Sequence, residues 1–171
     1  MTDDADMAGP AWAFAISFYA RPGVADACLC LQDRAGLDVV NMLMLIYAHT
    51  ELRKPLSAAE QAELAEKMRD WRETTVLPLR KIRRALKPSR TDVADEKKEL
   101  LRNEIKKTEL MAERLQIEMA AQWLITSASG TGLSLPTALQ ALLPAGGGTQ
   151  DAETAAALKC ILDAAESVRA G

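Results

Sequence analysis

A short segment that we expect to be helical carries several cations on one side. Successive residues of a helix lie about 100° apart, so four cations fall within an arc of about 100°: Arg80, Arg83, Arg84 and Lys87. No acidic residue occurs between Glu73 and Asp92. Such a stripe can bind phosphate groups or the acidic face of a partner helix. The alternative is a solvated surface whose charge is neutralised within the chain, by Glu96 or Glu99 for example.

A second group of polar residues borders the most apolar stretch of the chain. Helical bundles build ligand pockets between helices, and the side chains available here for such a pocket are Arg34, Asp38, Asn41 and His49. A structural interpretation competes with this one. Asp38 would cap the helix that follows it, and Arg34 would form an ion pair. His49 would then interact favourably with a helix C-terminus.

No catalytic or metal-binding motif accompanies these residues. Cys28 and Cys30 lie two residues apart, about 200° around a helix, and cannot hold one ion. The chain has a single histidine, so the glutamates of its later half lack the Glu-x-x-His pairing of di-iron bundles. The segment Ser127–Gly130 lacks the flanking residues of a nucleophile or phosphate loop. We therefore expect no catalytic residue, no metal and no cofactor.

The composition is that of a globular protein. The chain has 171 residues, 49% hydrophobic and 26% charged, with a net charge of −3, which suits one domain with its own core. The densest apolar run, residues 39–48, would span about 15 Å as a helix, half of a bilayer core, so we expect no membrane span. Three cysteines cannot all pair, and residues 1–10 carry no basic residue. These features favour the cytoplasm.

The elements that must position these residues are all predicted to be helices. No stretch alternates as a strand would, so we predict an all-α, bundle-like domain of six to eight helices. The helix over residues 39–52 is apolar all round and should lie at the centre of the fold. In the first helix, Trp12, Ile16 and Tyr19 should form the apolar stripe.

A long helix is predicted over residues 92–127. It would reach about 54 Å, so it must either break near residues 106–108 or project and pair with something. Its apolar seam is predicted to contain Leu101, Ile105, Ala112, Leu115, Met119 and Trp123.

Three regions are predicted along the chain. They are a disordered acidic segment over 1–9, a helical core over 10–90, and the long helix with C-terminal helices over 91–171, packing on the same core. A flexible Gly146–Gly148 linker leads to a last helix capped by Thr149, whose Leu158, Ile161 and Leu162 should cover part of the long helix.

Two runs of sequence resemble a known family. The first is F-Y-A-R-P-G-V with L-Q-D-R, within residues 18–45, and the second is W-R-E-T-T-V-L-P-L-R-K, which opens residues 71–87. Both resemble a small proteobacterial family known only as a conserved domain of unknown function. The resemblance covers about residues 10–90 and implies a helical intracellular protein. It brings no activity, ligand or catalytic residue.

The leading hypothesis is a non-enzymatic interaction or regulatory module, with a protein partner or a second copy bound through the long helix. The alternative is a bundle that binds a small molecule or lipid and could be enzymatic. Nucleic-acid binding through the basic helix is the weakest hypothesis, because the total charge is negative and no aromatic residue interleaves the cations. An uncovered apolar seam on the long helix would favour the first hypothesis, and an apolar pocket beside His49 the second.

Overall fold

The computed structural model describes residues 9–143 and 151–169, and this part of the chain is helical throughout, without strands. The predicted all-α class is confirmed. Apart from Gly9, the segment expected to be disordered lies outside the described residues, as do the Gly146–Gly148 linker and Thr149. The helices are α1 (Pro10–Tyr19), α2 (Val24–Ala35), α3 (Val39–Thr50), α4 (Ala58–Trp71), the π-helical η1 (Arg72–Val76), α5 (Leu77–Ala85), α6 (Asp95–Ser127), α7 (Leu135–Ala141) and α8 (Ala152–Arg169).

Local sequence signals set several of these boundaries. Helix α1 begins at Pro10, whose fixed φ suits a first helical position. Gly36 ends α2 in the left-handed conformation, with φ of 65°, as a C-terminal glycine cap requires. The side chain of Asp38 then accepts hydrogen bonds from the backbone N–H groups of Val40 and Asn41 at the start of α3.

The start of α4 is fixed more firmly than a cap alone would do. The sequence S-A-A-E over residues 57–60 has the pattern of a capping box, and the box is present, with Ser57 and Glu60 each accepting from the other's backbone N–H. Glu60 also accepts a hydrogen bond of 2.6 Å from the backbone N–H of Ser129. The hydrogen bonds from the Ser129 and Ser57 backbones lower the pKa of Glu60 to about 2. A Cβ atom at Gly132 would lie 2.0 Å from the carbonyl carbon of Leu56, so this connection runs directly against the chain before α4.

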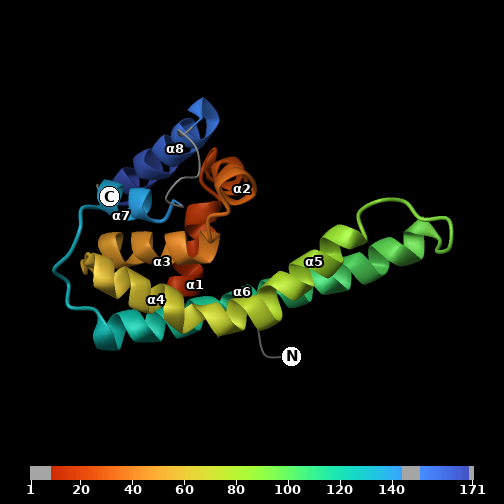
Figure 1. Ribbon diagram of the computed structural model, residues 1–171, viewed down its shortest axis with the longest axis horizontal. Coiled ribbons are helices and arrows are strands. Elements are labelled where there is room, and N and C mark those ends of the chain that lie inside the picture. The colour runs from red at the N-terminus through yellow and green to blue at the C-terminus, as the bar shows by residue number, and fades with distance from the viewer. Residues whose placement is uncertain (1–8, 144–150, 170–171) are drawn as a thin grey trace.

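Helix α3 lies at the centre of the fold, as predicted. Leu43 is 5% exposed and Ile46 is fully buried. Helices α1, α4, α6, α7 and α8 all pack on α3 (Figure 1). The later helices contribute to the same core cluster through Leu64, Leu124, Leu139 and Ile161.

The buried face of α1 differs from the prediction. Ala11, Ala15 and Phe18 are buried, whereas Ile16 is 49% exposed and Tyr19 is 37% exposed. Small alanine side chains let α1 approach α3 and α6 closely, with Phe18 buried beside them and Ile16 and Tyr19 turned outward. Within residues 9–143 and 151–169 no single helix is long and apolar enough to cross a membrane; α1 and α2 together pass that test by length and composition, with a bend of 94° between them.

Helix α6 is continuous over 33 residues, but its buried stripe is shifted from the predicted seam. Leu101 and Leu115, which were expected to be buried, are 53% and 42% exposed. The stripe that packs on the bundle consists of Ala112, Gln116, Ile117, Ala120 and Leu124. Hydrophobicity alone misplaced the seam because this stripe includes a fully buried glutamine and two alanines.

Helix α5, the connection that follows it and the first part of α6 form a projecting arm. Helices α4, η1 and α5 continue one another and run antiparallel to α6, and α5 leaves the bundle together with the first half of α6 (Figure 1). The π-helical turn ends at Val76, two residues before Pro78, whose ring would clash with the carbonyl four residues earlier in a regular α-helix. The helix therefore widens into a π-helical turn here instead of breaking. We call residues 77–108 the arm.

The C-terminal helix does not cover the long helix as expected. Helix α8 packs mainly along α2, on the side of the bundle away from the arm (Figure 1). Leu158 and Ile161 are buried there. The reason is that α2 presents its own apolar face, with Cys28 and Leu31 buried, and no other helix packs on it so extensively in the described part of the chain.

Candidate functional site

A groove opens at the elbow where the arm leaves the bundle, with a cavity of about 410 Å³ lined by α1, α2, α3, α5 and α6. Its walls carry exposed apolar side chains, between 37% and 49% exposed, from three different helices: Ile16, Tyr19, Leu29 and Leu110. Four charged residues from α5 and α6 also line the groove, and we call this group its floor: Arg80, Arg83, Glu109 and Glu113. We call this feature the elbow groove. Its walls offer an apolar surface, and its floor is polar.

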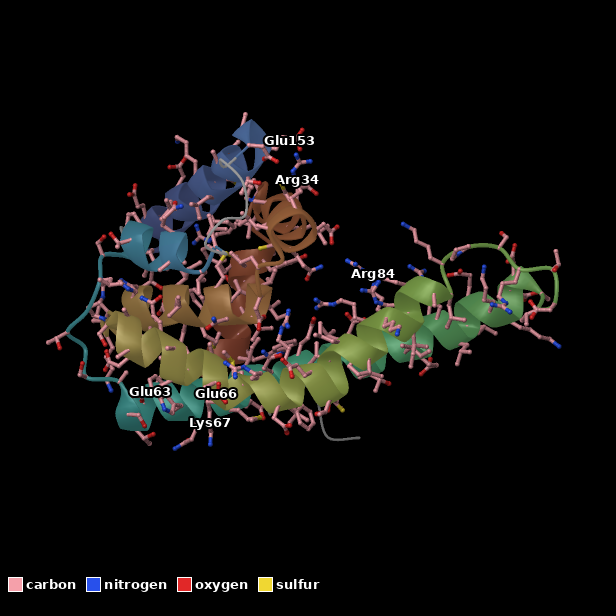
Figure 2. All side chains as sticks on the ribbon, in the orientation of Figure 1. Arg34, Glu63, Glu66, Lys67, Arg84 and Glu153 are labelled. Carbon is pink, nitrogen blue, oxygen red and sulfur yellow. The ribbon has the colours of Figure 1, made fainter. Side chains whose placement is uncertain are left out.

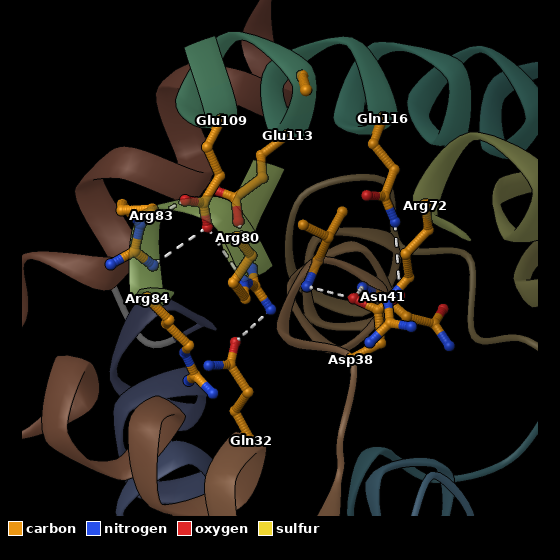
Figure 3. A network of polar contacts seen from close by, with 12 residues as sticks. Gln32, Asp38, Asn41, Arg72, Arg80, Arg83, Arg84, Glu109, Glu113 and Gln116 are labelled. Atoms are coloured by element: carbon orange, nitrogen blue, oxygen red, sulfur yellow. Dashed lines mark hydrogen bonds and ion pairs between the residues drawn. The ribbon is translucent and has the colours of Figure 1, made fainter. Parts of the chain in front are cut away.

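The floor is a network of ion pairs that joins three helices. Arg80 Nε lies 3.0 Å from a carboxylate oxygen of Glu109, and Arg80 Nη2 lies 2.6 Å from Glu113. The remaining Arg80 nitrogen donates to the side-chain oxygen of Gln32 at 2.8 Å. Arg83 forms a second pair with Glu109 (Figure 3). Because Gln32 is on α2, Arg80 on α5 and Glu109 on α6, the network fixes the arm against the bundle.

The two carboxylates of the floor have different electrostatic environments. Burial raises the pKa of Glu109, but the hydrogen bonds from Arg83 and Arg80 outweigh burial and leave that pKa below its ordinary value. Burial raises the pKa of Glu113 above its ordinary value, and here the nearby charge of Arg80 does not compensate. The floor thus has two guanidinium groups shared between two carboxylates. This arrangement holds the arm in place and leaves Glu109 engaged on both oxygens.

The structure places the four predicted stripe cations in different surroundings. Arg80 and Arg83 lie in the floor of the elbow groove, and Arg84 extends from the arm toward α2, 2.8 Å from Asp33 (Figure 2). Lys87 is exposed and forms no ion pair with the described residues. Three of the four charges are therefore neutralised within the chain.

The acids that neutralise the stripe were not the ones expected from the sequence. Glu96 and Glu99 lie farther along the arm, and Glu99 pairs instead with Arg102. Glu109 and Glu113 are four residues apart on one face of α6, and this spacing was the available signal. It could not be used without knowing that α5 folds back on that face.

The arm keeps a strong positive charge even after this pairing. Residues 77–108 contain eleven Lys and Arg but five Asp and Glu, a net charge of +6, so the rest of the chain has −9. Among the described residues of the arm, four cations form no ion pair: Lys81, Lys87, Lys97 and Lys106. The one acidic residue of the arm that forms no ion pair with the described residues is Glu96. Lys106 lines the elbow groove.

The predicted pocket residues are not brought together. Arg34 pairs with Asp151 at 2.5 Å and with Glu153 at 2.8 Å beside α8 (Figure 2). Asp38 caps α3 and also pairs with Arg72 at 2.9 Å, close to the buried Asn41 (Figure 3).

His49 lies at the other end of α3, in a separate cavity of about 530 Å³. Pro55, Leu135 and Leu162 line that cavity with it. Among the four predicted residues, only Asp38 and Asn41 are neighbours.

Comparison with known proteins gives one match. A family model described as "Protein of unknown function (DUF2390)" matches residues 10–120. The match confirms the resemblance seen over residues 10–90 and extends it through most of α6, so the arm and the elbow groove lie inside it. No curated protein and no solved structure matches the chain.

Proposed function

The chain belongs to the DUF2390 family of proteins of unknown function, and we propose that it is a non-enzymatic protein-interaction module whose elbow groove binds an amphipathic helix of an acidic partner. One observation carries this proposal. Ile16, Leu29 and Leu110 come from three different helices, and each is nearly half exposed in the same groove. Apolar side chains gathered in this way are typical of a surface that another molecule covers.

The shape and lining of the groove support a helix as the bound element. An amphipathic helix places its apolar side chains at positions i, i+3, i+4 and i+7, and these fill an apolar groove between helices. The floor network keeps the arm at a fixed angle, so the two walls are held apart before binding. A preformed groove avoids the ordering cost that a mobile one would add.

The charge distribution supports an acidic partner. The arm has a net charge of +6, and Lys106, which forms no ion pair with the described residues, lines the groove itself. An acidic helix would be attracted to this side of the molecule and oriented by it. Nucleic acid remains the weaker alternative, because Arg80, Arg83 and Arg84 already hold carboxylates and the rest of the chain is acidic.

A second candidate function is the binding of a small molecule or lipid. The cavity of about 530 Å³ beside His49 favours it, since its size is that of ligand pockets. For either function we propose the cytoplasm as the location. The state of the cysteines supports this, because Cys28, Cys30 and Cys160 are all free thiols.

Binding of defined peptides tests the proposed function. We expect a fluorescent amphipathic helical peptide with an acidic outer face to bind, and one with a basic outer face to bind at least tenfold more weakly, a difference of about 1.4 kcal/mol. The affinity of the acidic peptide, followed by fluorescence anisotropy, should fall as salt rises.

Leu29→Glu places a negative charge in the groove wall and should weaken the acidic peptide by at least about tenfold. The matched control is Leu100→Glu, the same change at a leucine that is 65% exposed outside the groove, and it should leave binding unchanged. Equal binding of both peptides, or equal effects of both variants, would contradict the proposal.

A further inference from the structure

Helix α6 presents a second apolar surface, on the side facing away from α5 and α3. At about 100° per residue, eight exposed side chains between residues 100 and 125 fall within an arc of about 80°. We call them the outer face of α6: Leu100, Glu104, Lys107, Met111, Leu115, Glu118, Gln122 and Ile125. The four apolar members are between 42% and 65% exposed. Steps of three and four residues separate consecutive members, which is the spacing of a helix-pairing seam.

No described part of the chain covers this face. The opposite side of α6 packs on the bundle through Ala112, Gln116, Ala120 and Leu124. Helix α1 meets α6 at the flank, where the guanidinium of Arg114 lies 5.9 Å from the ring centroid of Trp12. From Leu100 to Ile125 the outer face extends over about 39 Å. It lies on the side of α6 away from the arm's inner surface, so it is separate from the elbow groove.

The two ends of the outer face and two of its charged positions are self-complementary when the face is reversed. A two-fold rotation about the midpoint between Ala112 and Glu113 would set Leu100 opposite Ile125 and Lys107 opposite Glu118. Met111 is related to Arg114, and Leu115 to Leu110. An antiparallel pair of these helices would therefore place apolar residues opposite each other at both ends. It would also place a cation opposite an acid on each side of the centre.

We infer that the occupant of this face is a second copy of the chain, with the two α6 helices antiparallel around a two-fold axis. A two-fold contact requires one patch to complement itself, as Leu100 with Ile125 and Lys107 with Glu118 do here. A parallel pair would set Lys107 against Lys107 and Glu118 against Glu118, which repel. In the antiparallel pair, the basic arm of each copy would lie along the bundle of the other copy. The arm has a net charge of +6, and the residues outside the arm, which include the bundle, have a net charge of −9.

This inference rests on the proposed role as an interaction module and specifies one of its contacts. A strip about 39 Å long and about 10 Å wide is at the low end of specific interfaces, so the dimer should be weak. We expect dissociation in the micromolar range, and dissociation should be promoted by salt because ion pairs contribute to the contact.

Charge reversal and its rescue test the antiparallel pairing. In sedimentation velocity at micromolar concentration and low salt, the wild type should form dimers. Lys107→Glu alone sets two acids against each other, and Glu118→Lys alone sets two cations against each other, so each should lower dimer affinity about tenfold. The double variant restores opposite charges across the axis and should recover most of the wild-type affinity.

Several results would overturn the inference. These are a strict monomer at every concentration tested, a dimer that none of the variants changes, and a double variant weaker than either single one. Circular dichroism should show unchanged helicity, because both side chains are exposed and form pairs only within their own helix turns. Leu29→Glu should leave the dimer intact, and the apolar change Ile125→Ala, outside both the arm and the groove, should leave peptide binding intact while weakening the dimer, so failure at the elbow groove and failure at this face are distinguishable.

Discussion

Replacing Ile46 with alanine should lower the free energy of unfolding by about 2–5 kcal/mol. Ile46 is fully buried on α3, the helix that contacts most of the others, including α1, α4, α6, α7 and α8. Removal of its outer carbons loses their transfer free energy and leaves a cavity that five packed helices cannot easily close. Urea denaturation followed by circular dichroism measures the change.

The matched control is Ile16→Ala, the same substitution at a residue that is 49% exposed on α1. Little packed surface is lost there, so the cost should stay below about 1 kcal/mol. If the two variants lost equal stability, α3 would not be the centre of the fold.

The substitution Glu109→Gln should cost about 3 kcal/mol, the low end of the range for breaking a buried ion pair. Glu109 is 5% exposed and holds both Arg80 and Arg83. A neutral amide of the same size leaves the two guanidinium groups with only Glu113 as a charged partner in the floor. The low end applies because Arg80 and Arg83 retain some contact with solvent.

The matched control for this change is Glu104→Gln on the same helix. Glu104 pairs with Lys107 at 2.7 Å, but both side chains are more than two-thirds exposed, so the loss should be below about 1 kcal/mol. Denaturation of both variants at neutral pH gives the comparison. Equal costs would show that the floor network does not hold the arm against the bundle.

The parts of the fold that could be predicted from the sequence are those decided by local chemistry. The apolar circumference of α3 indicated its burial, and Gly36, Asp38 and the Ser57–Glu60 box marked helix ends. Each of these signals acts within a few residues, so no knowledge of the tertiary structure was needed.

The predictions that failed depended on how helices meet. The burial of Ala11 and Ala15 in α1 follows from close approach to α3 and α6, which hydrophobicity does not indicate. In α6, the same effect buried Gln116 and exposed Leu115. Helix α8 packs on α2 because of the apolar face there, and sequence distance gave no reason to choose it.

The candidate site was predictable only in part. The cationic segment around Arg80 and Arg83 was evident, and these two side chains lie in the elbow groove. Their pairing with Glu109 required knowledge that α5 folds back along α6. The apolar wall formed by Ile16 and Leu29 depends on the angle between α1 and α2, which no local pattern encodes.

Site-specific photocrosslinking in cells that naturally make this protein is the most direct test of the proposed interaction role. A photoreactive side chain would be placed at Leu29 in the elbow groove, and in a separate variant at Glu63, which lies on α4 outside it (Figure 2). The account predicts a discrete adduct from Leu29 alone, with a protein whose crosslinked peptide is an acidic amphipathic segment. No adduct from Leu29, or the same adducts from both positions, would contradict it.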